Sequence, residues 1–162
     1  MSTEHILIRR YQDSDLDQLI NLVRELQSHE VRLFERMKQA GDIGAWYVED
    51  LQRRCREHSG EILLIDCGGE LAGYAAVLGT VTQDDPDETA YVYAMVADIA
   101  VTERYRGRGL GKRLLSECER HARDAGARWL RISVLAGNTR ALQLYRHHGF
   151  ADHLVELEKP LS

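Results

Sequence analysis

The sequence has very little proline, little cysteine and no long apolar run. Its two prolines, Pro86 and Pro160, leave no proline-rich linker among 162 residues, and neither internal repeats nor low-complexity tracts interrupt the chain. A chain of this length is close to the usual size of one domain and can bury a substantial core. We therefore expect residues 1–162 to form a single domain.

The cysteine content, the hydropathy and the net charge argue against several classes of protein. Cys55, Cys67 and Cys118 form no Cys-x-x-Cys pair, which argues against a disulfide framework and against a zinc site. No run of about 18 apolar residues is present, and charged residues interrupt the first fifteen positions, so we expect neither a membrane span nor a secretory signal. The cytoplasm is the default location. A net charge of −5 argues against nucleic acid as a partner.

Hydrophobic periodicity in the first part of the chain favours both helices and strands. It predicts a strand at residues 6–8 and a helix that begins after an Asp-Ser-Asp cap at residues 13–15. Residues 29–58 are expected to be helical in pieces. The other elements expected in this part are a strand pair joined at a Gly-Gly turn (61–66 and 70–81), an exposed loop (83–88) and a long, bulged strand (89–101).

In the second part of the chain, the sequence predicts that helices and strands continue to alternate. A helix follows residue 109, presents one apolar face and stops at Gly126. A strand (129–135), a short helix (139–147) and a final strand (152–157) are expected after it. Strands and helices in this order indicate an α/β sandwich around a mixed sheet.

The most informative segment is residues 97–112, where an apolar strand runs into a glycine-rich turn and then into a helix. Three alternating glycines, Gly107, Gly109 and Gly111, let the backbone approach a ligand without a Cβ in the way. The free N–H groups and the dipole of a helix N-terminus favour a phosphate or pyrophosphate. Flanking cations strengthen this interpretation, so the segment predicts a site for an anionic cofactor.

The spacing of the glycines and the basic residues in this segment distinguishes between the cofactors that glycine-rich loops bind. A nucleotide-triphosphate P-loop would need glycine where Arg106 stands and serine or threonine where Arg113 stands. The dinucleotide pattern would need a third glycine where Lys112 stands. The pattern that fits is Arg-x-x-Gly-x-Gly over Arg106, Gly109 and Gly111. It resembles the coenzyme-A pyrophosphate loop of the GNAT N-acetyltransferase superfamily.

A second block extends the resemblance. Residues 138–150 are similar to the Asn-x-x-Ala-x-x-x-Tyr-x-x-x-Gly-Phe segment of that family. The resemblance implies a GNAT-like α/β three-layer sandwich, with a mixed central β-sheet flanked by helices, and acetyl-coenzyme A as the cosubstrate of an N-acetyltransferase. The residues that it assigns to cofactor binding are Ile99, Ala100, Val101, Arg106, Gly107, Arg108, Gly109, Leu110, Gly111, Lys112, Asn138, Arg140 and Tyr145.

The mechanism that the resemblance implies is direct attack of a primary amine on the thioester within a ternary complex, with no metal. Acetyl-coenzyme A would lie in a V-shaped opening between strands 98–101 and 129–135. The backbone N–H of Val101 would polarise the thioester carbonyl, and Tyr145 would act as general acid toward the departing thiolate. Asp98 matches an acidic position common in the family and is the candidate base. Many relatives have Glu-Asp where this chain has Ala97-Asp98, and a structural role for Asp98 is the alternative.

The resemblance assigns the acceptor site to residues 29–58 and 82–89. Acidic and aromatic residues there, among them Glu30 and Tyr47, suit a small-molecule amine better than a protein acceptor, while a solvated acidic surface is the alternative. A second interpretation of the chain is a non-catalytic regulatory module that binds coenzyme A or acyl-coenzyme A. Because the family often forms dimers, a homodimer is also expected.

Overall fold

A computed structural model describes residues 5–162 of the chain and contains one mixed β-sheet with the strand order β1-β2-β3-β4-β5. Neighbouring strands are antiparallel except β4 and β5, which are parallel. The strands are β1 (Ile6–Arg10), β2 (Glu61–Cys67), β3 (Glu70–Gln83), β4 (Tyr91–Val101) and β5 (Leu130–Ile132).

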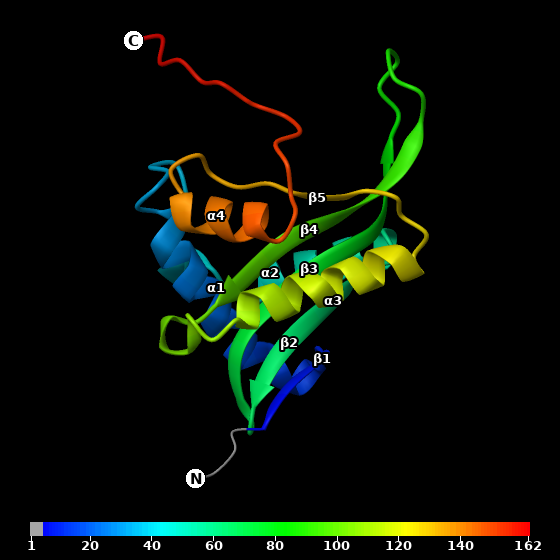
Figure 1. Cartoon of the computed structure of the whole chain (residues 1–162). Coiled ribbons are helices and arrows are strands. Elements are labelled where there is room, and N and C mark those ends of the chain that lie inside the picture. Colours follow the sequence, from blue (N-terminus) through cyan, green and yellow to red (C-terminus); the bar gives the residue numbers. More distant parts are fainter. Residues whose placement is uncertain (1–4) are drawn as a thin grey trace.

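Helices cover both faces of this sheet (Figure 1). They are α1 (Leu16–Glu30), α2 (Ala45–Glu57), α3 (Leu110–Asp124) and α4 (Thr139–His147). Alternate residues of β3 separate the two layers of the core, since successive side chains of a strand point to opposite faces. Tyr74 and Ala76 pack with α1 and α2, whereas Ala75 and Val77 pack with α3. The expected three-layer sandwich is confirmed.

Helix α3 follows the glycine-rich turn at residues 106–112, called the glycine loop below, and shows how the sequence builds the layer nearest to it. It begins after Gly109, whose φ of 74° is left-handed, and the chain turns away at Gly126, whose φ is 82°. Both conformations favour glycine because, at a positive φ, a Cβ comes too close to the carbonyl oxygen that follows it in the same chain. The predicted apolar face is buried: Leu110, Leu114, Leu115, Cys118 and Ala122. None of the helices between residues 5 and 162 has the length and apolar content needed to cross a membrane.

Strand β4 contains the predicted bulge, and the bulge lies where β4 parts from β5. Val96 pairs with Val77 and Asp98 with Ala76, so Ala97 is the extra residue. β5 follows β4 only from Ala94 to Val96. Beyond the bulge, residues 98–101 of β4 continue alongside β3 alone, and their other edge is open. The expected V-shaped opening therefore begins at residue 97.

Two strand predictions need correction. The strand expected at residues 129–135 is reduced to Leu130–Ile132, because β4 diverges and leaves the later residues without a ladder on that side. The strand expected at residues 152–157 is wrong. These residues are exposed, and no strand among residues 5–162 pairs with them. An apolar alternation forms a strand only where a neighbouring backbone supplies hydrogen bonds.

Candidate active site

The open edge of β4 presents backbone groups to the gap between β4 and β5. Thr102 N donates to Ala72 O of β3 at 2.9 Å. Because backbone groups alternate sides along a strand, those of Val101 and Ile99 face away from β3 and into the opening. Those of Ala100, opposite Tyr74, face β3. Of the three backbone positions expected to bind the cofactor, Ile99 and Val101 have the required direction.

The glycine loop joins this open edge to the N-terminus of α3. The first intrahelical bond of α3 runs from Arg113 N to Gly109 O at 3.1 Å, so the N–H groups of residues 110–112 precede it. Gly109, the N-cap, supplies no side-chain cap. Gly107 and Gly109 both have positive φ, and an added Cβ at either would project into open space. The loop thus offers free N–H groups at a positive helix end.

The arginine side chains of the loop are partly engaged within the chain. Arg106 Nε donates to Val101 O at 2.9 Å, which fixes the guanidinium at the open end of β4. The Arg108 guanidinium lies 5.1 Å from the centre of the Tyr105 ring. Neither contact blocks the N–H groups at the start of α3. The backbone is therefore the better defined part of this anion site.

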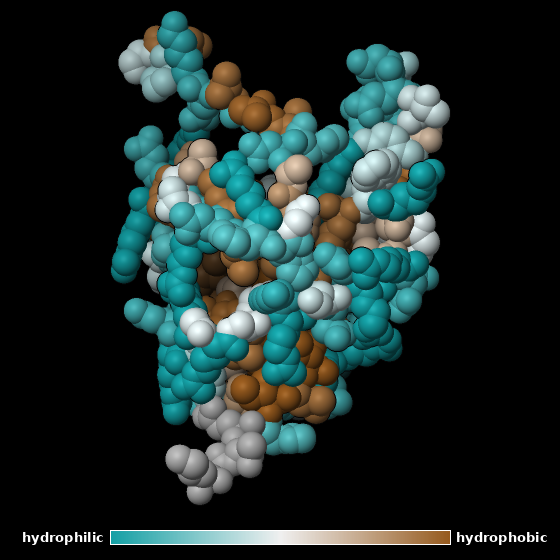
Figure 2. All heavy atoms as spheres, in the orientation of Figure 1, coloured by the Kyte–Doolittle hydropathy of each residue, from teal (hydrophilic) through white to brown (hydrophobic). Residues whose placement is uncertain are grey.

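Helix α4 forms the other side of the opening. Asn138 caps it by accepting a 3.2 Å hydrogen bond from Ala141 N, as its position in the sequence predicts. Arg140 is exposed in the first turn. A Cβ added to Gly111 would come within 3.2 Å of Leu144 Cδ2, so Gly111 lets α4 approach α3 closely. Figure 2 shows a hollow with apolar walls between α4 and the start of α3.

Tyr145, in the last turn of α4, is buried but its hydroxyl forms no hydrogen bond with residues 5–162. Its ring meets Phe150 edge-on, with the two ring centres 6.0 Å apart. Burial, helped by the charges of Asp98 and Glu30, raises the pKa of Tyr145 to about 12. Tyr145 thus keeps its proton at neutral pH, and the proton is available to a ligand.

Asp98, the first residue of β4 beyond the bulge, holds the centre of a hydrogen-bond network. Its Oδ2 accepts hydrogen bonds from the hydroxyls of Tyr47 in α2 and Tyr74 in β3, each at 2.8 Å. Burial raises the pKa of Asp98, while the hydrogen bonds from the two tyrosines and the backbone of Ile99 oppose the shift. The same negative charge, added to burial, raises the pKa values of Tyr47 and Tyr74. Asp98 is thus a fixed carboxylate with increased basicity.

Glu30, the last residue of α1, adds a second carboxylate to this region. Burial, followed by the charge of Asp98, raises the pKa of Glu30. The charge of Glu30 also contributes to the raised pKa values of Tyr47, Tyr74 and Tyr145. Five side chains from five elements therefore interact electrostatically: Asp98, Glu30, Tyr47, Tyr74 and Tyr145. A bound cation would offset the negative charge of the two carboxylates.

Sequence reasoning found only part of this cluster. Tyr145 and Asp98 came from the family resemblance, and Glu30 and Tyr47 from the acidic and aromatic composition of residues 29–58. Tyr74 was missed, because a tyrosine in a strand rich in alanine and β-branched residues is typical of the hydrophobic core. Only the fold shows that Tyr74 lies on the same face of the sheet as α1 and α2.

Two of the three cysteines, Cys55 and Cys118, are poor nucleophiles. Burial raises the pKa of Cys55 to about 11 and that of Cys118 to about 12. Both thiols stay protonated near neutral pH, and the thiolate is the nucleophilic form. Covalent catalysis through either residue is therefore disfavoured.

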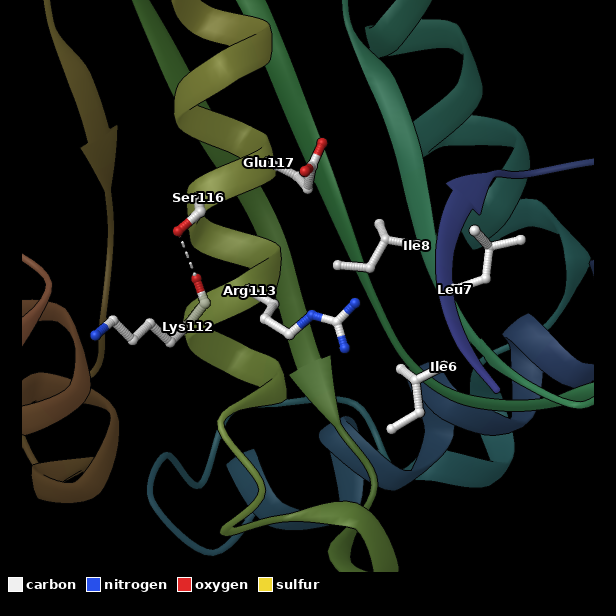
Figure 3. A pocket seen from close by; sticks show the side chains of 7 residues that line it. All are labelled: Ile6, Leu7, Ile8, Lys112, Arg113, Ser116 and Glu117. Atoms are coloured by element: carbon white, nitrogen blue, oxygen red, sulfur yellow. Dashed lines mark hydrogen bonds between the residues drawn. The ribbon is translucent and has the colours of Figure 1, made fainter. Parts of the chain in front are cut away.

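A pocket of about 430 Å³ lies between β1 and α3, away from the cluster around Asp98. Figure 3 shows Arg113 and Glu117 of α3 on the side that faces Ile6 and Ile8 of β1. Lys112 points away from these residues, on the opposite flank of the helix. This pocket contains neither Asp98 nor Tyr145, the residues that the sequence predicts for catalysis. Lys112, which the resemblance assigns to the cofactor, is one of its lining residues, but its side chain points away from β1.

Comparison with known proteins gives a consistent result. A family model described as "Acetyltransferase (GNAT) family" matches residues 19–150. The chain is 27% identical over 153 residues to thialysine N-epsilon-acetyltransferase of Bos taurus, covering 94% of this chain and 88% of that protein. It is 35% identical over 78 residues to the uncharacterized N-acetyltransferase YycN of Bacillus subtilis, an alignment that spans about half of each chain (48% and 47%). A solved structure of a mutant BH1408 protein from Bacillus halodurans superposes with a TM-score of 0.85 at 17% identity, covering 96% of this chain and 99% of that one.

Proposed function

The chain belongs to the acetyltransferase (GNAT) family and is an N-acetyltransferase, and from that premise we propose that it transfers the acetyl group of acetyl-coenzyme A to a small primary amine. The proposal rests on one observation: a site suited to an anion and a site suited to a cation lie at the same opening. Free N–H groups at the start of α3 suit an anionic pyrophosphate. The carboxylates of Asp98 and Glu30 suit a cation.

The glycine loop would hold the pyrophosphate through the N–H groups of residues 110–112. The absence of side chains at Gly107 and Gly109 lets the ligand approach the backbone. The open edge of β4 would pair with the amides of the pantetheine arm, in the manner of an added strand. When bound, acetyl-coenzyme A supplies an activated thioester.

The acceptor amine would enter as an ammonium group attracted by Glu30 and Asp98. An ammonium must lose a proton before its nitrogen has a lone pair for attack. Burial raises the pKa of Asp98, and we propose that Asp98 receives this proton, directly or through water. Glu30 then acts in binding and orientation. The name of the bovine relative, an enzyme for the ε-amine of thialysine, supports a small amine as the acceptor class.

The chemical step is a direct displacement. The amine nitrogen forms a bond to the thioester carbon, the carbon–sulfur bond breaks, and the thiolate receives a proton from Tyr145. The nitrogen then loses its second proton to water, and Tyr145 regains its own proton from water. The Val101 N–H, directed into the opening, donates to the carbonyl oxygen as negative charge develops there. A pKa near 12 makes Tyr145 a weak acid in the empty site. Part of the shift comes from Asp98 and Glu30, so a bound cation lowers this pKa toward its ordinary value.

The test is to incubate the protein with acetyl-coenzyme A and a panel of diamines, basic amino acids and aminoglycosides, and to detect acetylated products by mass spectrometry. Calorimetry with acetyl-coenzyme A alone accompanies it. An acetylated amine together with measurable cofactor binding supports the proposal. Binding without any product favours the non-catalytic regulatory module, and the absence of binding rejects the cofactor assignment.

A further inference from the structure

Arg54, in the last turn of α2, is a half-buried cation that pairs with no side chain of the described structure. Within residues 5–162 its guanidinium forms neither an ion pair nor a hydrogen bond. The two carboxylates nearest to it along the helix, Asp50 and Glu57, bind Arg53 instead, at 2.5 and 2.7 Å. A guanidinium carries several N–H donors in a planar fork that matches a carboxylate. The fork of Arg54 is therefore available to a ligand.

Arg54 lies on the same side of α2 as Tyr47, whose hydroxyl donates to Asp98. Two turns of an α-helix take about seven residues, so the two side chains face one direction and their backbones are about 10 Å apart along the axis. Burial raises the pKa values of Asp98 and Tyr47, and the positive charge of Arg54 opposes both shifts. The guanidinium thus acts on the same region as the carboxylate of Asp98 without pairing with it.

The last turn of α2 lies farther along the sheet than Asp98. A Cβ added to Gly60 would come 3.0 Å from Cys55 Cα and 3.2 Å from Leu78 Cα, so the residue that follows Arg54 packs beside Leu78. Leu78 stands two residues beyond the position of β3 that pairs with Asp98. The helix therefore carries Arg54 along β3, away from the carboxylate.

The β4 residues along this stretch are apolar. Met95, which pairs with Leu78, and Ala97, the bulge residue, are only partly buried against the layer of α1 and α2. A methylene chain laid along them would remove apolar surface from water. In order along the sheet, this region presents the carboxylates of Asp98 and Glu30, an apolar stretch and a free guanidinium.

We propose that Arg54 binds a carboxylate of the acceptor, and that the acceptor is an amino acid in which several methylene groups separate the reacting amine from that carboxylate. The assignment rests on the proposed function, in which Asp98 and Glu30 attract the amine. Arg54 then donates two parallel hydrogen bonds to the carboxylate. A linear diamine would place a second ammonium against the guanidinium, and the repulsion disfavours it.

Two ligands that differ only in the carboxylate test the proposal: 6-aminohexanoate and pentylamine, titrated by NMR into the complete chain with and without coenzyme A. We expect the wild type to bind 6-aminohexanoate at least about 10-fold more tightly, as for a charge-assisted hydrogen bond. Glycine, in which a single carbon separates the two groups, is too short to reach both ends and should have no such advantage over methylamine.

Arg54→Met should reverse the order of effects on the two ligands. It should weaken 6-aminohexanoate at least about 10-fold, and it should strengthen pentylamine, because a repelling cation is gone. Arg54→Lys keeps the charge but loses the fork, so it should retain part of the advantage. Arg56→Met is the matched control: Arg56 is exposed on the opposite side of the same helix, and its loss should leave the full advantage of 6-aminohexanoate.

Equal affinities of the wild type for 6-aminohexanoate and pentylamine would overturn the proposal. An Arg54→Met variant that changes both affinities alike would also overturn it, since Arg54 then acts only through the net charge of the region. Thiol release from acetyl-coenzyme A separates these results from the fate of the proposed function. Acetylation of both ligands with equal kcat/KM supports acetyl transfer and overturns the role of Arg54. A binding preference that depends on Arg54, without any acetylated product, supports that role and counts against acetyl transfer to these amines.

Discussion

The Tyr47 hydroxyl donates a 2.8 Å hydrogen bond to Asp98 Oδ2, and this bond ties α2 to the point where β4 leaves β5. Tyr74 donates to the same oxygen from the adjacent strand. Asp98 is therefore oriented from two sides at the edge of the proposed cofactor opening. The interaction also explains how a partly buried carboxylate is retained there, since each donated bond stabilises its charged form.

Removing one donor should make Asp98 more basic. In Tyr47→Phe the charged carboxylate loses a stabilising hydrogen bond, so its pKa rises further. The acidic limb of the pH profile of kcat/KM for the amine should then move up by roughly one pH unit. Tyr11→Phe, a partly buried tyrosine in the same core layer, is the control and should leave the limb in place. An identical profile for Tyr47→Phe would remove Asp98 from the proton-transfer step.

Tyr145→Phe should impair turnover without impairing cofactor binding. The ring and its edge contact with Phe150 are retained, while the donor to the leaving sulfur is lost. We expect kcat to fall by about 100-fold, which is typical of a lost general acid, and the calorimetric Kd for acetyl-coenzyme A to stay within about twofold. A variant with wild-type kcat would contradict the acid role.

Glu30→Gln should weaken amine binding and stabilise the empty protein. Burial and the charge of Asp98 raise the pKa of Glu30 above its unfolded value of about 4.3. The unfolded state therefore binds fewer protons between these two values, and stability falls as pH rises through that window. Removing the charge should raise Tm at pH 7 but not below about pH 4. KM for a cationic acceptor should rise by about 10-fold, for a lost charge contact.

Glu117→Gln is the matched control for that variant, because Glu117 lies on the side of α3 that faces β1 (Figure 3). It should change neither KM nor the pH dependence of Tm. If both glutamine variants raise KM equally, the effect is a long-range one of net charge and Glu30 has no special place in the acceptor site.

Gly109→Val should weaken acetyl-coenzyme A binding by more than its strain explains. A valine at a φ of 74° costs about 1–2 kcal/mol of stability, and its side chain would fill the space from which the pyrophosphate approaches the loop. Gly126→Val imposes similar strain at a φ of 82°, at the other end of α3. Calorimetry should show loss of binding only in the first variant. Equal affinities in the two would mean that the glycine loop does not contact the cofactor.

Arg9 should contribute stability that depends on pH. Its guanidinium contacts Asp15 in bidentate fashion at 2.8 and 2.9 Å and Asp66 at 2.8 Å. The bond to Arg9 lowers the pKa of Asp15, and bonds from the Gly69 backbone and from Arg9 lower that of Asp66. Carboxyl groups with lowered pKa values stabilise the fold above about pH 4 and lose that contribution as pH falls through the folded values.

The corresponding variant is Arg9→Met, which leaves two largely buried carboxylates without their cation. We expect it to lower the free energy of unfolding by about 3 kcal/mol at pH 7. In urea titrations the difference from the wild type should shrink toward pH 3, where both carboxyls gain protons. A difference that stays constant with pH would show that Arg9 stabilises the fold through packing alone.

The sequence predicted those parts of the molecule that local patterns determine. The glycine loop, the amphipathic face of α3 and the Asn138 cap follow from residues near one another in the chain, and all three are found where expected. Imperfect alternation also predicted a bulge within residues 89–101, without its position, and the structure places it at Ala97.

The parts that escaped prediction depend on distant residues. Tyr47 and Tyr74 meet at Asp98 only because α2 packs across the sheet, and no spacing in the sequence encodes that meeting. The strand expected at residues 152–157 was wrong for a related reason. Its alternation specifies an extended backbone with one apolar side, whereas the presence of a neighbouring strand is a property of the assembled fold.

The most direct test of the central claim is the rate of thiol release from acetyl-coenzyme A, measured with a chromogenic thiol reagent as the concentration of a small cationic amine is raised. We predict a rate that saturates with the amine, yields one acetylated product per thiol released, and falls by about 100-fold in Tyr145→Phe. A chain that binds acetyl-coenzyme A but releases no thiol with any small amine would contradict the account.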